Sequence, residues 1–208
     1  KVHGSPCHVV YTDYRPTPLE HWVFPTGASD IYNVVQAGGI FREDEFQKAV
    51  EEVQNAKADG SRTGAAKTGK GVTAANAADS GSEKSDVFKV VRLVVERQLD
   101  PCIVFTLSKA DVEKRATQEM LSMNLTDEVE KEMIGAIYRN AIEVLGEEDR
   151  KLAQVTSLIP VLKRGIGMHH SGMLPILREV VEILFQEGLL KVLFATETFS
   201  TGLNMPAK

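Results

Sequence analysis

The chain has 208 residues, 43% of them hydrophobic, and a formal net charge of −5 at pH 7. This length and apolar content suffice for one well-buried α/β domain with a small appendage, but not for two full domains. The negative charge argues against a protein that coats a polyanion over its whole surface, although it leaves room for a local basic strip.

Residues 1–41 are predicted to be an extended appendage. The stretch "HVVYT" is rich in β-forming residues, and the two prolines of "YRPTPLEHW" oppose a helix. Further on, "HWVFP" and "IYNVV" flank "TGASD", which has the composition of a turn. We therefore expect an N-terminal β-hairpin.

Residues 42–54 are predicted to form a short amphipathic helix. Phe46, Ala49, Val50 and Val53 recur at helical spacing, and acidic residues precede them, as suits a helix N-terminus. The following residues, 55–85, are nearly all small or polar, so they bury too little apolar surface to offset chain entropy. We expect a disordered insertion there, either a solvated spacer or a tether for nucleic acid.

The insertion contains "GAAKTGKGVT", most of a Walker A phosphate-binding loop. Its Gly64, Gly69 and Lys70 match the pattern, but Gly71 stands where Ser or Thr should hold magnesium. No apolar strand leads into the loop, and a glycine-lysine pair arises easily in such a composition. We interpret the motif as a coincidence and not as a nucleotide site.

From residue 86 to residue 208, helical and strand patterns alternate. Helix-like periodicity is seen in "DVFKVVRLVVERQ", "TDEVEKEMIGAIYRNAIEVLG", "KLAQVTSLIPVLKRG" and "LPILREVVEILFQEG". Between them lie three strand-like segments, "PCIVFTL", "GIGMHH" and "LLKVLFAT". Ser108, with Asp111 three residues later, has the layout of a capping box for a further helix. The pattern predicts an α/β fold with a parallel sheet flanked by helices.

In open parallel sheets, ligands bind the loops at the carboxyl ends of the strands. Three polar segments fall there, "TLSK", "HHSGMLP" and "ATETFSTGLN". Ser108 and Lys109 could hold a phosphate, although a serine cap followed by lysine is more often simple helix chemistry. The third segment has an unusual density of small hydrogen-bonding side chains, which the core does not require and which could contact phosphates.

The adjacent histidines of "MHHSGM" do not indicate a zinc site. Neighbouring residues on a strand point to opposite faces, so His169 and His170 cannot easily share one ion. We expect one imidazole to be buried, while the other faces a ligand together with Ser171 and the amide of Gly172.

Cys7 and Cys102 are far apart and fit no metal or redox motif, which favours a reduced intracellular compartment. Cys102 lies in an apolar strand-like segment and is not expected to be catalytic. No apolar run reaches the roughly 20 residues of a membrane helix, and the first residues lack a signal-peptide core. We expect a soluble protein without a membrane partner.

These segments resemble a known family. "YTDYRPTPL", "IVFTLSK" and "GIGMHHSGMLPILREVVEILFQEGLLKVLFATETFSTGLNMPA" are similar to the second RecA-like domain of the exosome-associated, superkiller-like DExH-box RNA helicases. In that comparison "IVFTLSK" matches helicase motif IV, "GIGMHHSGMLP" the block called IVa, and "ATETFSTGLNMPA" motif V. The resemblance covers the whole chain and implies an ATP-dependent 3'–5' RNA helicase that feeds RNA to the exosome.

The resemblance also implies roles for individual residues. A path for single-stranded RNA would be lined by Ser108, Lys109, His170, Ser171, Gly172, Thr196 and Glu197. Gly202 and Asn204 would face the nucleotide cleft between two motor domains. ATP and Mg²⁺ would bind mainly to a first RecA-like domain. Partners would be the RNA exosome and TRAMP-type adaptor proteins, and the location nuclear or, as for the superkiller branch, cytoplasmic.

The chain departs from the family pattern in several places. It has no true Walker A or DExH sequence, and it stops before a motif VI. Ser171 and Ser200 stand where glycine and alanine are commoner. We therefore expect a fragment that hydrolyses no ATP alone. Two other readings stay open, a docking module for exosome adaptors that uses residues 1–41, and a doubly wound domain without a motor role.

Overall fold

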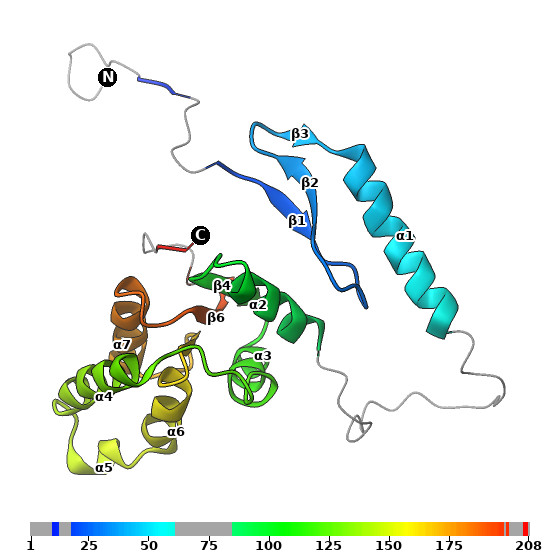
Figure 1. The fold of residues 1–208 in the computed structure, drawn as a ribbon. Helices are drawn as coiled ribbons and strands as arrows, with labels where there is room; N and C mark the ends of the chain where they lie inside the picture. Colours follow the sequence, from blue (N-terminus) through cyan, green and yellow to red (C-terminus); the bar gives the residue numbers. More distant parts are fainter. Residues whose placement is uncertain (1–9, 13–17, 61–84, 198, 200–205, 208) are drawn as a thin grey trace. The chain divides into compact units, whose positions relative to one another are not determined.

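In a computed structural model of the chain, the structure describes residues 10–12, 18–60, 85–197, 199 and 206–207, with only the backbone for 56–60 (Figure 1). The chain divides into two compact units, Lys1–Asn76 and Ala77–Lys208, each with its own sheet. The motif at 64–73 and the predicted cleft residues Gly202 and Asn204 lie outside the described residues.

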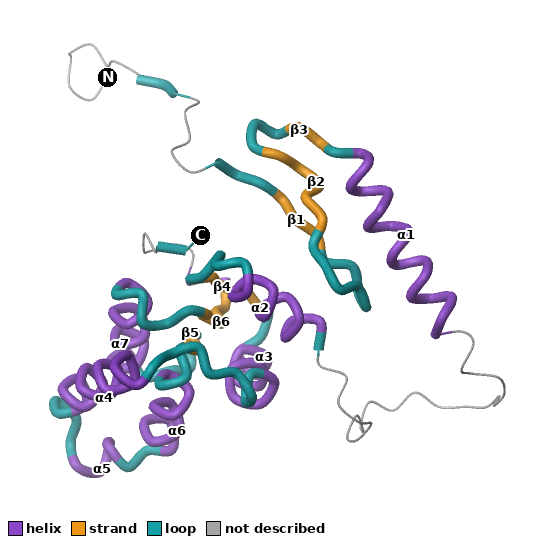
Figure 2. Tube along the Cα trace, in the orientation of Figure 1, coloured by secondary structure: helices purple, strands orange, loops and turns teal. Residues whose placement is uncertain are grey.

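The first unit is an antiparallel sheet with one helix (Figure 2). Strands β1 (His21–Val23) and β2 (Tyr32–Gln36) pair antiparallel, which confirms the predicted hairpin. A turn with Gly38 and Gly39 at φ of +89° and +79° then leads to β3 (Ile40–Phe41), which the sequence did not indicate. These positive φ values suit glycine because it has no Cβ to clash.

Helix α1 (Glu43–Gly60) contacts β2 and completes the first unit. It begins with Glu43, Asp44 and Glu45, whose charges complement the helix dipole. The helix runs six residues beyond the predicted end at residue 54, since alanine and lysine in "NAKADG" favour a helix even without an apolar face. Residues 10–12, from the predicted β-rich stretch, are not in a strand.

The second unit is built on three parallel strands, β4 (Cys102–Thr106), β5 (Ile166–His169) and β6 (Val192–Thr196). Their order is β4-β6-β5, so the last strand along the chain lies in the middle. Both pairings are parallel, which confirms the predicted α/β class. Residues of β5 and most of β6 are buried, as continuous apolar strands covered on both faces should be.

Helices precede and connect these strands, with bounds as follows: α2 (Asp86–Glu96), α3 (Lys109–Lys114), the π-helical turn η2 (Arg115–Glu119), α4 (Glu128–Ile142), α5 (Glu147–Arg150), α6 (Ala153–Leu162) and α7 (Pro175–Gln186). The helix predicted after Ser108 therefore changes to π geometry at Arg115. Helix α3 contacts all three strands, and α6 and α7 contact β5.

Local signals account for where several helices begin and end. Ser108 caps α3 by accepting a hydrogen bond from the amide of Asp111, as predicted. Asp127 and Glu130 form a reciprocal capping box at α4. Pro175 occupies the first turn of α7, and Gly188 follows that helix at a φ of +70°.

The core lies between the sheet and its helices. The buried face of α7 consists of Leu177, Val180, Val181, Leu184 and Phe185. Each such side chain stabilises the fold by about 1.5–3 kcal/mol when it leaves water. Gly167 allows β5 to pack closely in this core, because a Cβ there would lie 2.8 Å from Cδ1 of Leu193 on β6 and 2.9 Å from Cδ1 of Leu190.

Candidate nucleic-acid interface

The three polar segments predicted to bind a ligand leave the same edge of the parallel sheet. Thr106 at the end of β4 is the register partner of Thr196 at the end of β6, and His169 at the end of β5 pairs with Ala195. Neighbouring strands lie about 4.8 Å apart. The end of β6 therefore lies between the ends of β4 and β5, so the strands that precede the three segments all end at the same edge.

Lys109 and Gly172 lie in contact at this edge. A Cβ built on Gly172 would be 3.4 Å from Cδ of Lys109, so the lysine stem lies against the turn after β5. Lys109 is exposed, as is Ser171 at the tip of that turn. An exposed ammonium group beside an exposed hydroxyl is suited to contacting a phosphate.

Ser108 is less available than the sequence suggested. Its Oγ accepts from the amide of Asp111 at 3.1 Å and donates to Oδ2 of Asp111 at 2.7 Å. Oγ1 of Thr106 donates in turn to the carbonyl of Ser108. The hydroxyl proton of Ser108 would reach a phosphate only by leaving the Asp111 carboxylate, so Lys109 is the stronger contact in this loop.

The two histidines point to opposite sides, as predicted. Nε2 of His169 lies 2.7 Å from Oε1 of Glu182 on α7, and its ring packs on Phe199 with centroids 4.6 Å apart. Nε2 of His170 lies 3.2 Å from Oε1 of Glu113 on α3. Two imidazoles that face different helices do not form one ligand set.

His170 itself does not lie on the surface. Its side chain is only 2% exposed, so the expected direct contact between this imidazole and RNA is not what the structure shows. The reason is packing: the ring turns inward beneath the turn that follows β5. Nδ1 of His170 accepts a hydrogen bond from the amide of Gly172 at 3.1 Å, so that amide is also already engaged.

The turn after β5 is held from α6 as well. The side-chain amide of Gln154 donates to the carbonyl of Gly172 at 3.1 Å, and its oxygen accepts from the amide of Leu174 at 2.8 Å. The amide of Met173 donates to the carbonyl of His170, which closes the turn. The role of Gln154 was not predicted, because nothing in the local sequence pattern links it to Gly172 and Leu174, which lie 18 and 20 positions further along the chain.

The electrostatic surroundings of His170 favour its neutral form. Burial lowers the pKa of this imidazole below its usual value; Lys109 and His169 lower it further, whereas Glu113 acts in the opposite direction. Since Nδ1 accepts a hydrogen bond, the neutral ring carries its proton on Nε2, toward Glu113. Nε2 lies 3.2 Å from Oε1 of Glu113, a contact that would be an ion pair only with the ring protonated.

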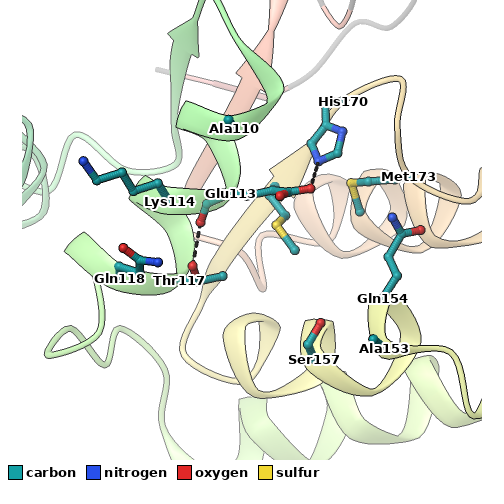
Figure 3. A pocket seen from close by; sticks show the side chains of 11 residues that line it. Ala110, Glu113, Lys114, Thr117, Gln118, Ala153, Gln154, Ser157, His170 and Met173 are labelled. Atoms are coloured by element: carbon teal, nitrogen blue, oxygen red, sulfur yellow. Dashed lines mark hydrogen bonds and ion pairs between the residues drawn. The ribbon is translucent and has the colours of Figure 1, made fainter. Parts of the chain in front are cut away.

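A pocket of about 380 Å³ opens beside this turn, between α3–η2 and α6 (Figure 3). Figure 3 shows Glu113 reaching across it to His170, with Gln154 and Met173 on the opposite wall. Its other lining residues are Ala110, Lys114, Thr117, Gln118, Ala153, Ser157 and Met168. The pocket thus contains the side chains that support the turn and is not a separate polar site.

The end of β6 contributes Thr196, which is partly buried, and Glu197, which is exposed. Both lie at the middle of the edge formed by the three loops. The other hydrogen-bonding side chains of the segment "ATETFSTGLN", those of Thr198, Ser200, Thr201 and Asn204, lie outside the described residues.

Among the residues that the structure describes, no group of three or more His, Cys, Asp or Glu side chains could hold a metal ion. Burial, reinforced by Asp100, raises the pKa of the Cys102 thiol to about 11, which makes it a poor nucleophile. Among the described helices, none combines the length and apolar character needed to cross a bilayer.

Taken together, these elements define an α/β domain with exposed polar side chains at the edge where its parallel strands end. No family model matches the chain. It is, however, 50% identical over 208 residues to the DExH-box ATP-dependent RNA helicase DExH9 of Arabidopsis thaliana. It is 49% identical over 210 residues to the ATP-dependent RNA helicase mtr4 of Schizosaccharomyces pombe, and 47% over 209 residues to the exosome RNA helicase MTR4 of Homo sapiens.

Each of these matches covers 100% of this chain and 20%, 18% and 19% of the respective relative. The chain therefore belongs to the superkiller-like group of DExH-box RNA helicases, and it spans about a fifth of the length of the relatives it matches.

Proposed function

We propose that residues 86–208 form the second RecA-like motor domain of an ATP-dependent RNA helicase. The observation that supports this most directly is the in-register ending of β4 and β6 beside β5, which gathers all three candidate loops at one edge. Relatives named as ATP-dependent RNA helicases match this chain from end to end. Residues 1–41 would be the linker and hairpin that join this domain to the first one.

In this proposal the edge grips the backbone of single-stranded RNA. Lys109 supplies the cation, Ser171 a hydroxyl at the tip of its turn, and Thr196 and Glu197 the central loop; Ser108 acts mainly as the cap of α3. Backbone contacts fix the register of a strand but carry no base information. The domain would therefore bind RNA of many sequences.

ATP and Mg²⁺ would supply the phosphoryl-transfer chemistry in the whole protein, held mainly by a first RecA-like domain. In this proposal the part of the present chain is to hold RNA and to move with it. Closure and reopening of two such domains shifts the grip along the strand, which in this family gives 3'–5' translocation. The chain alone should hydrolyse no ATP.

The proposed setting is RNA processing or decay by the exosome. The human relative is named an exosome RNA helicase, and this name supports the exosome as a partner of the whole protein here. TRAMP-type adaptors and a nuclear location form part of the same proposal. The alternative is a cytoplasmic location, as for the superkiller branch of the family. This chain is 38% identical over 205 residues to superkiller complex protein 2 of Mus musculus.

The test uses the whole protein and measures RNA-stimulated ATP hydrolysis. Lys109→Ala and Thr196→Ala should each reduce the stimulation by RNA and leave the basal rate close to wild type, because these residues hold RNA and not nucleotide. Lys151→Ala, at an exposed position beside Glu148, serves as the matched control. Unchanged stimulation in both edge variants would contradict a motor role for this edge.

A second candidate function is docking of adaptor proteins by the first unit. An apolar cleft of about 370 Å³ lies between its hairpin and α1, lined by Val23, Phe24, Pro25, Phe46, Ala49, Val50, Val53 and Gln54. Apolar clefts of this size are suited to anchoring a partner's side chain. Binding of exosome adaptors that survives deletion of residues 1–41 would argue against this function.

A further inference from the structure

Two side chains, one from α6 and one from the residue directly after β5, form hydrogen bonds with the backbone of the turn after β5. Gln154 of α6 bonds both the carbonyl of Gly172 and the amide of Leu174, while Nδ1 of His170 accepts from the amide of Gly172. Ser171 lies between His170 and Gly172, the two turn residues joined by the last of these bonds. The conformation of the exposed turn is thus stabilised by the buried His170 side chain and the partly buried Gln154 side chain.

We propose that His170 and Gln154 are positioning residues for RNA, and that the turn presents Ser171 and the adjoining Lys109 to the strand only while His170 is uncharged. This inference rests on the proposed RNA-binding function of the edge and adds a control of that site that the function does not require.

The hydrogen bond from the Gly172 amide depends on which ring nitrogen of His170 carries a proton. In the neutral ring Nδ1 is free to accept from the Gly172 amide, 3.1 Å away. A charged imidazole has N–H groups on both nitrogens. Protonation would therefore place two donors face to face at this distance, and the turn would have to open.

The groups around His170 determine how readily it charges. Glu113 and Lys109 of α3 and His169 of β5 are the charged and titratable groups that act on it, and Lys114 of α3 lines the same pocket. From α6 and η2 come only uncharged neighbours in this pocket, among them Ser157 and Gln118. Burial, Lys109 and His169 together outweigh Glu113, so the ring is neutral at neutral pH and charges on acidification.

Acidification should change the RNA affinity of this chain in the direction opposite to that expected from charge alone. Acidification makes a protein more positive, and this normally strengthens binding to RNA through the phosphates. Here it should weaken binding, because the loss of turn geometry acts on the very residues that contact the strand. The two effects have opposite signs, so stronger RNA binding at acid pH would contradict a role for His170 protonation.

The first experiment measures binding of a fluorescently labelled single-stranded RNA to the 208-residue chain at constant salt, from neutral pH to below the ordinary histidine pKa of about 6.5. The wild-type affinity should fall on acidification. His170→Asn should bind like wild type at neutral pH and lose the acid effect, since Asn Oδ1 can accept from the amide two residues on, as in an Asx turn, and does not titrate. His170→Ala should bind weakly at every pH.

The second experiment tests Gln154 in the same assay. Gln154→Met keeps the length of the side chain and removes both hydrogen bonds, and it should weaken binding at neutral pH by roughly fivefold or more. Gln186→Met is the matched control, because Gln186 is exposed at the opposite end of α7 from the turn. Thermal unfolding of each variant shows whether it is folded at the pH used.

The outcomes separate the inference from the proposed function. If the wild-type chain binds no RNA at neutral pH, both are overturned. If it binds RNA but binding is constant or stronger at acid pH, or if His170→Asn keeps the acid effect, only the inference is overturned. The ring ¹⁵N shifts of His170 provide an independent measurement, since they report whether Nδ1 lacks a proton at neutral pH; a protonated Nδ1 there would also overturn it.

Discussion

Thr106 and Thr196 are register partners at the carboxyl ends of β4 and β6, so the loops that begin with Leu107 and Glu197 leave the sheet side by side. β5 ends on the other side of β6, and its turn reaches back to contact Lys109. The candidate RNA contacts thus come from three segments that span about 90 residues of sequence. Their proximity is a property of the parallel sheet.

Lys109→Ala should weaken RNA binding by the chain and reduce its dependence on salt. A lysine that neutralises one phosphate of a single strand releases about 0.7 of a counterion, so the slope of log K against log salt should become shallower by about this amount. Binding titrations at several salt concentrations measure it. Lys151→Ala should leave the slope unchanged; an equal change in both variants would show that only net charge matters.

Gly167→Ala should destabilise the second unit. The new methyl group would meet Leu193 and Leu190 at 2.8 and 2.9 Å inside a packed core, and overpacking of this kind typically costs about 1–3 kcal/mol. Urea unfolding followed by circular dichroism measures the change. Gly135→Ala is the comparison, because its Cβ would meet only the flexible ends of Arg139 and Lys163, and helix propensity favours alanine there.

The free energy of unfolding should fall as the pH falls below about 6.5, the ordinary histidine pKa. The folded state lowers the pKa of His170, so the unfolded chain binds a proton more readily, and the stabilisation present above that pH is lost toward the folded pKa. Urea unfolding at several pH values tests this. His170→Asn should lose less stability over the same range, and an identical profile would assign the effect to other groups.

Tyr138→Phe should weaken the packing of α4 against α6. The buried Tyr138 hydroxyl donates to the carbonyl of Val155 at 2.6 Å, and loss of such a bond typically costs about 1–2 kcal/mol. Burial raises the pKa of Tyr138 to about 12, so the hydroxyl remains a donor through moderately alkaline pH. Urea unfolding provides the comparison with Tyr32→Phe, whose exposed hydroxyl lies 3.5 Å from Glu52 and should matter little.

Much of the fold follows from local patterns. The apolar spacing of α7, with Pro175 at its start and Gly188 after its end, identifies that helix without any tertiary information. The same holds for Ser108 as a cap, because its partner Asp111 is three residues away. Two features were not predicted: the change to π geometry at Arg115, and the length of α1, where helix propensity continues the helix past its last apolar position.

For the candidate site, the sequence by itself determined which polar segments follow the parallel strands, since a continuous apolar run is typical of such strands. Only the tertiary structure decided that His170 turns inward, that Gln154 holds the turn from α6, and that β6 lies between the other two strands. The physical reason is distance along the chain. Periodicity shows which side of an element is apolar, but the partner that meets a given side chain depends on contacts between residues far apart in sequence.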